Sequence, residues 1–143
     1  MSVGRYQFGE VAEKLFEDVK IKRGKTGKVR FVLKKNLIAT LRPRDSLFVL
    51  DSEGAKMLHS LTYKFRIVVK DEVLDFARDG RDVFAKHVLS CDPELRAYDE
   101  VLVVDTEDNL ISFGKLMLSP EEIKYFDRGI AVKVRKSLYN LKE

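Results

Sequence analysis

The chain has 143 residues, a formal net charge of +4, 45% apolar residues and 35% charged residues, so it can form one ordinary domain or two small ones. No run approaches the roughly 20 apolar residues of a membrane-spanning helix, and the first residues lack the apolar stretch of a signal peptide. Cys91 is the only cysteine, which excludes an internal disulfide. We therefore expect a cytoplasmic protein with no membrane partner, stabilised by packing alone.

The positive charge is concentrated in the first half of the chain. Residues 1–65 contain 14 Lys and Arg against 7 Asp and Glu, a net charge of +7, whereas residues 66–143 contain 13 against 16, a net charge of −3. Residues 20–36 contain eight basic residues and no acidic one. Such a patch indicates a polyanionic partner, because each phosphate neutralised by Lys or Arg releases counterions. The alternative is a surface that serves solubility.

The first elements predicted are a helix and a basic β-hairpin. Apolar residues at helical spacing over residues 11–19 predict an amphipathic helix. Apolar and basic residues then alternate over residues 19–34, and a turn with two glycines at residues 23–27 divides this stretch, which is typical of a hairpin. Its outward face is basic, and we expect four of its side chains to contact RNA: Lys22, Arg23, Lys25 and Lys28.

The rest of the first half predicts two more strands and a second helix. Residues 37–41 and 47–50 have the composition of strands. Either Asp51 or Ser52 can cap the helix that follows, through a side-chain oxygen. The order of elements is therefore helix, three or four strands, helix.

The second half has the pattern of a small closed β-barrel, in which short β-branched runs alternate with turn residues. A short helix over residues 72–79 is expected to end at Gly80, because a glycine there adopts the left-handed conformation without steric cost. Another helix is expected over residues 119–125, and Gly114 is expected at a strand bend or bulge. The predicted strands span residues 65–69, 83–89, 99–105, 110–118 and 128–135.

Three motifs of this half resemble the PUA domain, an RNA-binding barrel, and most closely the version found in archaeal tRNA-guanine transglycosylase. They are Gly-Arg-Asp-Val-Phe-Ala-Lys from Gly80, Asp-Pro-Glu-Leu-Arg from Asp92 and Arg-Gly-Ile-Ala-Val-Lys-Val-Arg from Arg128. Motifs of the first half, such as Lys-Thr-Gly-Lys-Val-Arg from Lys25, resemble the domain that precedes the PUA barrel in this transglycosylase and in archaeosine synthase.

The resemblance implies the fold class and the domain boundaries. The expected protein is α+β, with a small amino-terminal α/β pre-PUA domain at residues 1–64. A PUA pseudo-barrel of mixed β-strands and short helices is expected at residues 65–143.

The same resemblance implies where RNA would bind. In PUA domains the nucleic acid lies along the first helix, the glycine that ends it and the second strand, with the last strand at the opposite edge. Phe84 has two interpretations, since an exposed ring would stack on a base whereas a buried ring would belong to the core. The implied RNA-binding residues are Arg78, Gly80, Arg81, Val83, Phe84, Lys86, His87, Lys133, Arg135 and Lys136.

Catalysis is not expected. Full-length transglycosylases of this family need a separate catalytic barrel with a cysteine-rich zinc site, which a single cysteine cannot build. His59 and His87 lie in different halves of the chain, and Ser-Cys-Asp-Pro around Cys91 does not match the Pro-Cys-Lys-Gly run of archaeosine synthase. The acidic pairs at residues 71–72 and 121–122 suit the first turns of helices. We expect no metal site and no cofactor.

The function implied is RNA binding, most specifically tRNA binding, without catalysis. The chain resembles the carboxyl-terminal half of the archaeal transglycosylase, which suggests an accessory subunit working with a separate catalytic protein in archaeosine formation, a tRNA modification. The alternative is a ribosome- or translation-associated PUA interaction protein. The negative charge of the barrel half predicts that the barrel depends on the basic hairpin for affinity.

Overall fold

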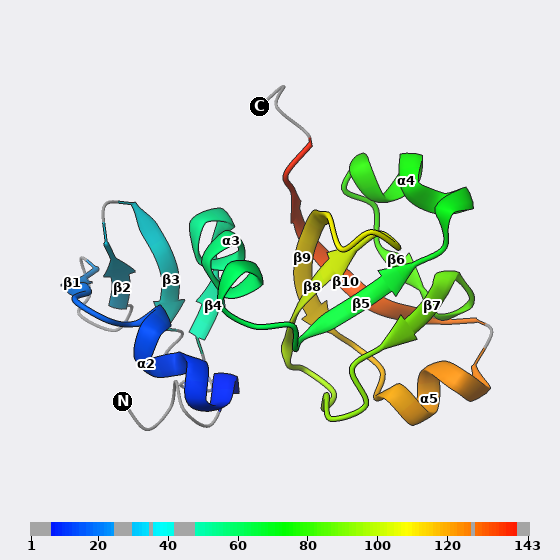
Figure 1. Ribbon diagram of the computed structural model, residues 1–143, viewed down its shortest axis with the longest axis horizontal. Coiled ribbons are helices and arrows are strands. Elements are labelled where there is room, and N and C mark those ends of the chain that lie inside the picture. The colour runs from blue at the N-terminus through cyan, green and yellow to red at the C-terminus, as the bar shows by residue number, and fades with distance from the viewer. Residues whose placement is uncertain (1–6, 25–29, 35, 42–47, 127, 140–143) are drawn as a thin grey trace. The chain divides into compact units, whose positions relative to one another are not determined.

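The computed structural model describes residues 7–24, 30–34, 36–41, 48–126 and 128–139. The chain divides into two compact units, Met1–Thr62 and Tyr63–Glu143 (Figure 1). Each unit combines short helices with a mostly antiparallel sheet, which confirms the α+β class. In this described part of the chain, no helix has the length and the apolar character needed to cross a membrane.

The first unit begins with a short helical segment and ends with its longest helix. A 3-10 turn at Gly9–Val11 leads into α2 at Ala12–Leu15, so the predicted helix ends earlier than expected. Helix α3 spans Ser52–Leu61. Of the two predicted caps, Asp51 has the role, because its carboxylate accepts a hydrogen bond of 2.7 Å from the backbone N–H of Ser52.

The sheet of the first unit has four antiparallel strands in sequential order. The predicted hairpin is confirmed by the pairing of β1 with β2, although residues 25–29 of its turn lie outside the described residues. The core contains Leu15, Val32, Ile38, Leu50 and Leu58. The strands are β1 at Lys20–Arg23, β2 at Arg30–Leu33, β3 at Leu37–Leu41 and β4 at Phe48–Leu50.

The two edges of this sheet differ. At β4, the buried side-chain amide of Gln7 donates to the carbonyl of Phe48 at 2.9 Å and accepts from its N–H at 2.7 Å. Strand β1 lies at the opposite edge, and all four of its residues are exposed. Exposed charged residues on an edge strand hinder pairing with a strand of another molecule. The charges of β1 therefore remain in solvent.

The second unit forms a six-stranded sheet that curls into a nearly closed pseudo-barrel (Figure 1). Its strand order is β6-β10-β9-β8-β5-β7, and only β5 and β8 are parallel. Largest among its fully buried side chains are Ile67, Leu102, Ile111, Phe113 and Leu116. The strands are β5 at Arg66–Val69, β6 at Val83–Phe84, β7 at Val88–Cys91, β8 at Glu100–Val104, β9 at Leu110–Leu116 and β10 at Ile130–Ser137.

The prediction of one strand over residues 83–89 was wrong. A 3-10 turn at Ala85–His87 divides this run into β6 and β7, which lie at the two edges of the sheet. The turn joins β6 to β7 directly, so the two edges of the sheet lie close to each other at this point. Apolar residues stand on both sides of Lys86 and His87, which is why the composition alone did not reveal the break.

Two short helices accompany the barrel. A 3-10 turn at Asp71–Val73 leads into α4 at Leu74–Arg78. Helix α5 spans Pro120–Tyr125 and begins with a capping box, in which the Ser119 hydroxyl accepts from the N–H of Glu122 and the Glu122 carboxylate accepts from the N–H of Ser119. The structural interpretation of the acidic pair at residues 121–122 is therefore confirmed.

Gly114 permits a close approach of two strands. A Cβ atom at this position would overlap the backbone carbonyl oxygen of Lys133 on β10. The pairing of β9 with β10 is irregular between Val134 and Lys136, which agrees with the predicted bulge in this region. The absence of a side chain at Gly114 allows the β10 backbone to pass directly over β9.

Candidate nucleic-acid interface

The Gly80 turn has the geometry that the sequence predicts. Gly80 has φ of +82°, and its N–H donates to the carbonyl of Ala77 at 3.0 Å, which ends α4. The Ser137 hydroxyl at the end of β10 donates to the carbonyl of Arg78 at 2.6 Å. A Cβ built on Gly80 would lie 3.6 Å from the Cβ of Ser137. The end of α4 is thus fastened to the end of β10, which brings two predicted parts of the interface together.

Two arginine–aromatic pairs flank this turn. The Arg81 guanidinium lies 5.4 Å from the ring centre of Phe76, and the Arg78 guanidinium lies 5.5 Å from that of Tyr139. Phe76 is 55% exposed and Tyr139 is 49% exposed. Exposed rings beside guanidinium groups provide flat surfaces for unpaired bases and cations for phosphates. We therefore add Phe76 and Tyr139 to the candidate site.

The sequence contained only a weak signal for these two rings. Val73 and Ala77 are buried at a spacing of four residues, and Phe76 lies beside this pair without belonging to it. Tyr139 follows the last strand and shows no pattern in the sequence. Its place beside Arg78 depends on the contact of β10 with the end of α4.

Phe84 lies on the exposed side of β6 and is 43% exposed, so the core interpretation of this residue was wrong. Together with Lys86, Arg128 and Gly129 it lines a pocket of about 310 Å³. The neighbouring Val83, also a predicted RNA contact, is buried in the core and pairs with Val132 of β10, so its side chain is not available to a ligand. An aromatic ring with two cations beside it suits a base and its phosphate.

His87 borders Phe84 with an edge-to-face contact of 6.0 Å between ring centres. Desolvation by partial burial lowers the pKa of His87, and the ammonium groups of Lys86 and Lys70 lower it further. Glu72 opposes this effect. Because the pKa lies below the ordinary value of 6.5, His87 is mainly neutral at pH 7 and adds little positive charge to the site.

The basic residues of β10 fall into two groups. Lys133 and Lys136 are exposed, and no ion pair to either is found within the described residues. Arg135 instead donates to both carboxylate oxygens of Glu100, at 2.6 and 2.9 Å. Glu100 is only 3% exposed, so this bidentate pair neutralises a buried carboxylate. The Arg135 guanidinium is therefore engaged by a buried carboxylate, although 29% of the arginine side chain remains exposed.

The described basic residues of strand β1 in the hairpin lie in solvent. Lys22 and Arg23 belong to the fully exposed strand β1, as does Lys20. The pairing of β1 with β2 places Lys22 opposite the half-buried Phe31. The other two predicted contacts, Lys25 and Lys28, lie outside the described residues.

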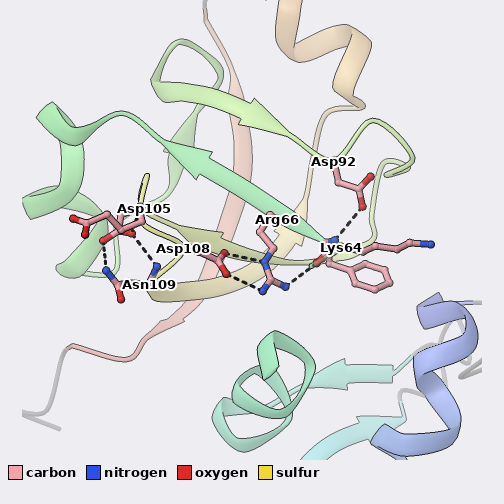
Figure 2. A network of polar contacts seen from close by, with 8 residues as sticks. Lys64, Arg66, Asp92, Asp105, Asp108 and Asn109 are labelled. Atoms are coloured by element: carbon pink, nitrogen blue, oxygen red, sulfur yellow. Dashed lines mark hydrogen bonds and ion pairs between the residues drawn. The ribbon is translucent and has the colours of Figure 1, made fainter. Parts of the chain in front are cut away.

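A polar network fastens the beginning of β5 to neighbouring loops (Figure 2). Arg66 donates to both carboxylate oxygens of Asp108, at 3.1 and 3.3 Å, and to the carbonyl of Lys64 at 3.0 Å. Asp92 accepts from the N–H of Phe65, whose φ is +68°. These contacts stabilise an unusual backbone conformation, and they assign these charged side chains to the fold.

Asp105 shapes the turn between β8 and β9 in the same network (Figure 2). Its carboxylate accepts from the backbone N–H groups of Glu107 and Asn109 and from the side-chain amide of Asn109. Burial alone would raise the pKa of Asp105, but these hydrogen bonds together lower it. An ionised carboxylate therefore holds this turn.

The described residues contain no group of three or more His, Cys, Asp or Glu side chains suited to a metal ion. Burial raises the pKa of the Cys91 thiol, and the nearby carboxylate of Asp92 raises it further. A thiol with a raised pKa is mainly protonated at neutral pH, which disfavours nucleophilic attack.

Comparison with known proteins identifies the family. Residues 65–138 match the PUA domain, so the chain belongs to the PUA domain family. Residues 1–64 match the patch-forming domain C2 of tRNA-guanine transglycosylase. The tRNA-guanine(15) transglycosylase of Pyrococcus abyssi is 46% identical over 141 residues, and that of Methanocaldococcus jannaschii is 42% identical over 139 residues. The resemblance drawn from the motifs is therefore confirmed.

These alignments cover 96% and 94% of this chain but only 24% and 21% of the two relatives, so the chain spans about a quarter of their length. Two solved structures share the fold. A hypothetical protein from Pyrococcus horikoshii OT3 has a TM-score of 0.72 at 21% identity, covering 99% of this chain and 92% of its own. A conserved PUA domain protein from Thermoplasma acidophilum has a TM-score of 0.62 at 15% identity, covering 84% and 76%.

Proposed function

We propose that the chain binds RNA, most specifically tRNA, through the Gly80 turn and the exposed strand β1. The observation that carries this proposal is the junction of α4 and β10, where the half-buried Gly80 is flanked along the chain by two arginines, each beside an exposed ring. Cations and aromatic faces around such a turn suit an unpaired segment such as a tRNA end. The similarity to enzymes named tRNA-guanine(15) transglycosylases supports tRNA among RNAs.

We further propose that the chain is non-catalytic and serves a separate catalytic protein of tRNA modification. The matched region is a quarter of the relatives' length, and the site offers binding groups rather than a nucleophile with a base. In this arrangement the chain would hold the tRNA while the partner modifies it.

Fluorescence anisotropy with a labelled tRNA transcript tests the binding, at salt concentrations between about 50 and 200 mM. We expect an affinity that falls linearly with salt on a logarithmic scale. We also expect weaker binding of a transcript that lacks its unpaired 3′ end. Equal binding of both transcripts would contradict the assignment of the Gly80 turn to an unpaired segment.

The accessory role requires a second experiment. The tagged chain is purified from its own cells, and the bound RNA and proteins are identified. Recovery of tRNA together with a modification enzyme supports the accessory role. Recovery with small ribosomal subunits would instead favour a translation-associated protein.

A further inference from the structure

A second concave surface lies between strand β7 and helix α5, which are neighbours in the barrel unit (Figure 1). Its volume is about 470 Å³, which is enough for one or two side chains of a partner. Helix α5 packs on the Ala85–His87 turn, and the groove runs beside β7. Apolar groups from both elements line it, among them Val88, Leu89, Cys91, Pro120 and Ile123.

Strand β7 is an edge strand that pairs with β5 alone in the described sheet. In an antiparallel pair, alternate backbone N–H and C=O groups point away from the partner strand. Along β7 these groups face the side of the sheet where no further strand is described. An open strand edge beside an apolar groove is the arrangement that accepts an extended peptide as an additional strand.

The side chain of Leu89 marks the open side of this edge. The pairing of β5 with β7 places Val68 opposite Ser90 and Val69 opposite Val88, so Leu89 is the extra residue of a bulge. Leu89 is 56% exposed although it lies in a strand of an otherwise well-packed barrel. A bulge re-aims a side chain, and here it presents leucine to a ligand in the groove.

The charged side chains that line the groove are both basic, although the carboxylate of Asp92 lies near its lining residue Cys91. Lys86 and Lys124 line it, and no acidic side chain is among its described lining residues. Both lysines are exposed, and no ion pair to either is found within the described part of the chain. An acidic partner would complement them. A second copy of this chain is disfavoured, because pairing β7 with β7 would bring the same lysines together.

We propose that β7 and α5 bind an extended, acidic segment of a partner protein. The segment adds as a strand to the open edge of β7 and places an apolar side chain between Leu89 and Ile123. An Asp or Glu of the segment pairs with Lys124. RNA is a poorer fit, because phosphates gain nothing from the apolar lining, whereas a peptide uses the strand edge, the apolar pocket and the lysines together.

Phage-displayed random decapeptides selected on the full-length chain test this proposal. We expect the selected peptides to alternate apolar and other residues and to contain Asp or Glu. A synthetic selected peptide should shift the amide resonances of residues 88–91. It should also slow alkylation of Cys91, which is the only thiol in the chain. A peptide with N-methylated backbone amides cannot donate the hydrogen bonds of an added strand. It should neither shift these resonances nor slow the alkylation of Cys91.

Charge reversal provides the matched control. Lys124→Glu should lower the affinity for the acidic peptide by about threefold to fivefold, as expected for a rim ion pair. The same variant should raise the affinity for a version of the peptide in which lysine replaces the acidic residue. Lys136→Glu, an equal change on β10, should leave peptide binding unchanged. Leu89→Lys should remove binding without loss of folding, because the side chain is exposed.

Three results would overturn the proposal. In the first, no peptide is selected whose binding depends on Leu89. In the second, the N-methylated peptide binds as well as the parent. In the third, a uridine decamer protects Cys91 whereas the peptides do not, which would assign the groove to RNA.

Discussion

Strand β1 of the first unit and the arginines of the second unit hold their positive charges in different ways. On β1 of the first unit, Lys20, Lys22 and Arg23 are exposed, and no ion pair to them is found within the described residues. Among the described residues of the second unit, five arginines each pair with a carboxylate, namely Arg66, Arg78, Arg81, Arg96 and Arg135. Net charge by itself is therefore a poor guide to binding. The availability of each charge depends on what the fold places beside it.

The degree of burial separates the arginines further. Arg66 and Arg135 pair with carboxylates at short distance, and one partner of each pair is largely buried, so their charges serve the fold. Arg78 and Arg81 pair with exposed aspartates of their own segment, and such surface pairs contribute little free energy. A phosphate can replace an exposed aspartate at small cost. The barrel therefore has fewer available cations than its composition suggests, but those at Gly80 remain usable.

The largest expected effect comes from breaking an internal pair of the barrel. Arg135→Leu leaves the buried carboxylate of Glu100 without its bidentate partner, which should lower the free energy of unfolding by roughly 2–4 kcal/mol. Urea unfolding followed by circular dichroism measures this change. The double variant Glu100→Leu, Arg135→Leu should recover much of the loss, because the buried carboxylate is removed together with the arginine. If Arg135→Leu instead weakens tRNA binding at unchanged stability, the arginine belongs to the interface.

The next effect concerns the exposed charges of the first unit. Replacing Lys20, Lys22 and Arg23 by Ser should flatten the salt dependence of tRNA binding by about 0.7–0.9 per lost phosphate contact. Stability should change by no more than about 0.5 kcal/mol, because the strand is exposed. Adding Lys25→Ser and Lys28→Ser tests the remainder of the predicted hairpin contacts. As a matched control, Lys14→Ser and Lys56→Ser remove exposed charges from the helices of the same unit, and they should leave the slope unchanged.

A smaller effect should separate the two roles of the Gly80 turn. Gly80→Val introduces a β-branched residue at positive φ, which should cost roughly 1 kcal/mol or more of stability and block the approach of RNA. Arg81→Ala should weaken tRNA binding with a stability change within about 0.5 kcal/mol. Melting temperature and affinity are measured for both variants. If Arg81→Ala binds tRNA like the wild type, Gly80 is only a helix cap and the RNA lies elsewhere.

The smallest effect is the titration of His87. Its pKa in the folded chain is lowered, so its contribution to stability is present above the unfolded-state pKa of about 6.5 and is lost as the pH falls through the folded-state pKa. A bound phosphate near the ring would have the opposite influence and raise this pKa. Affinity for tRNA should therefore increase modestly between about pH 7.5 and 6. His87→Gln should remove this increase, and an unchanged pH profile in that variant would place His87 outside the interface.

The sequence alone determined most of the secondary structure, because hydrophobic periodicity and local capping act over short distances. The hairpin, the capped helix α3, the strands of the barrel and the left-handed Gly80 follow from spacing and turn residues. Its motifs were also specific enough to identify the PUA family. These features depend on residues that are close together along the chain.

Only the tertiary structure decided which side chains are available to bind RNA. The division of residues 83–89 between two sheet edges follows from closure of the barrel, which no local pattern encodes. Arg135 and the lysines of β10 look equivalent in sequence, yet the arginine is the one that forms a bidentate pair with Glu100 of a different strand. Tyr139 joins the site because β10 ends beside α4. For Arg135 and Tyr139 the deciding partner lies far away in sequence, and its position is fixed by packing of the whole barrel.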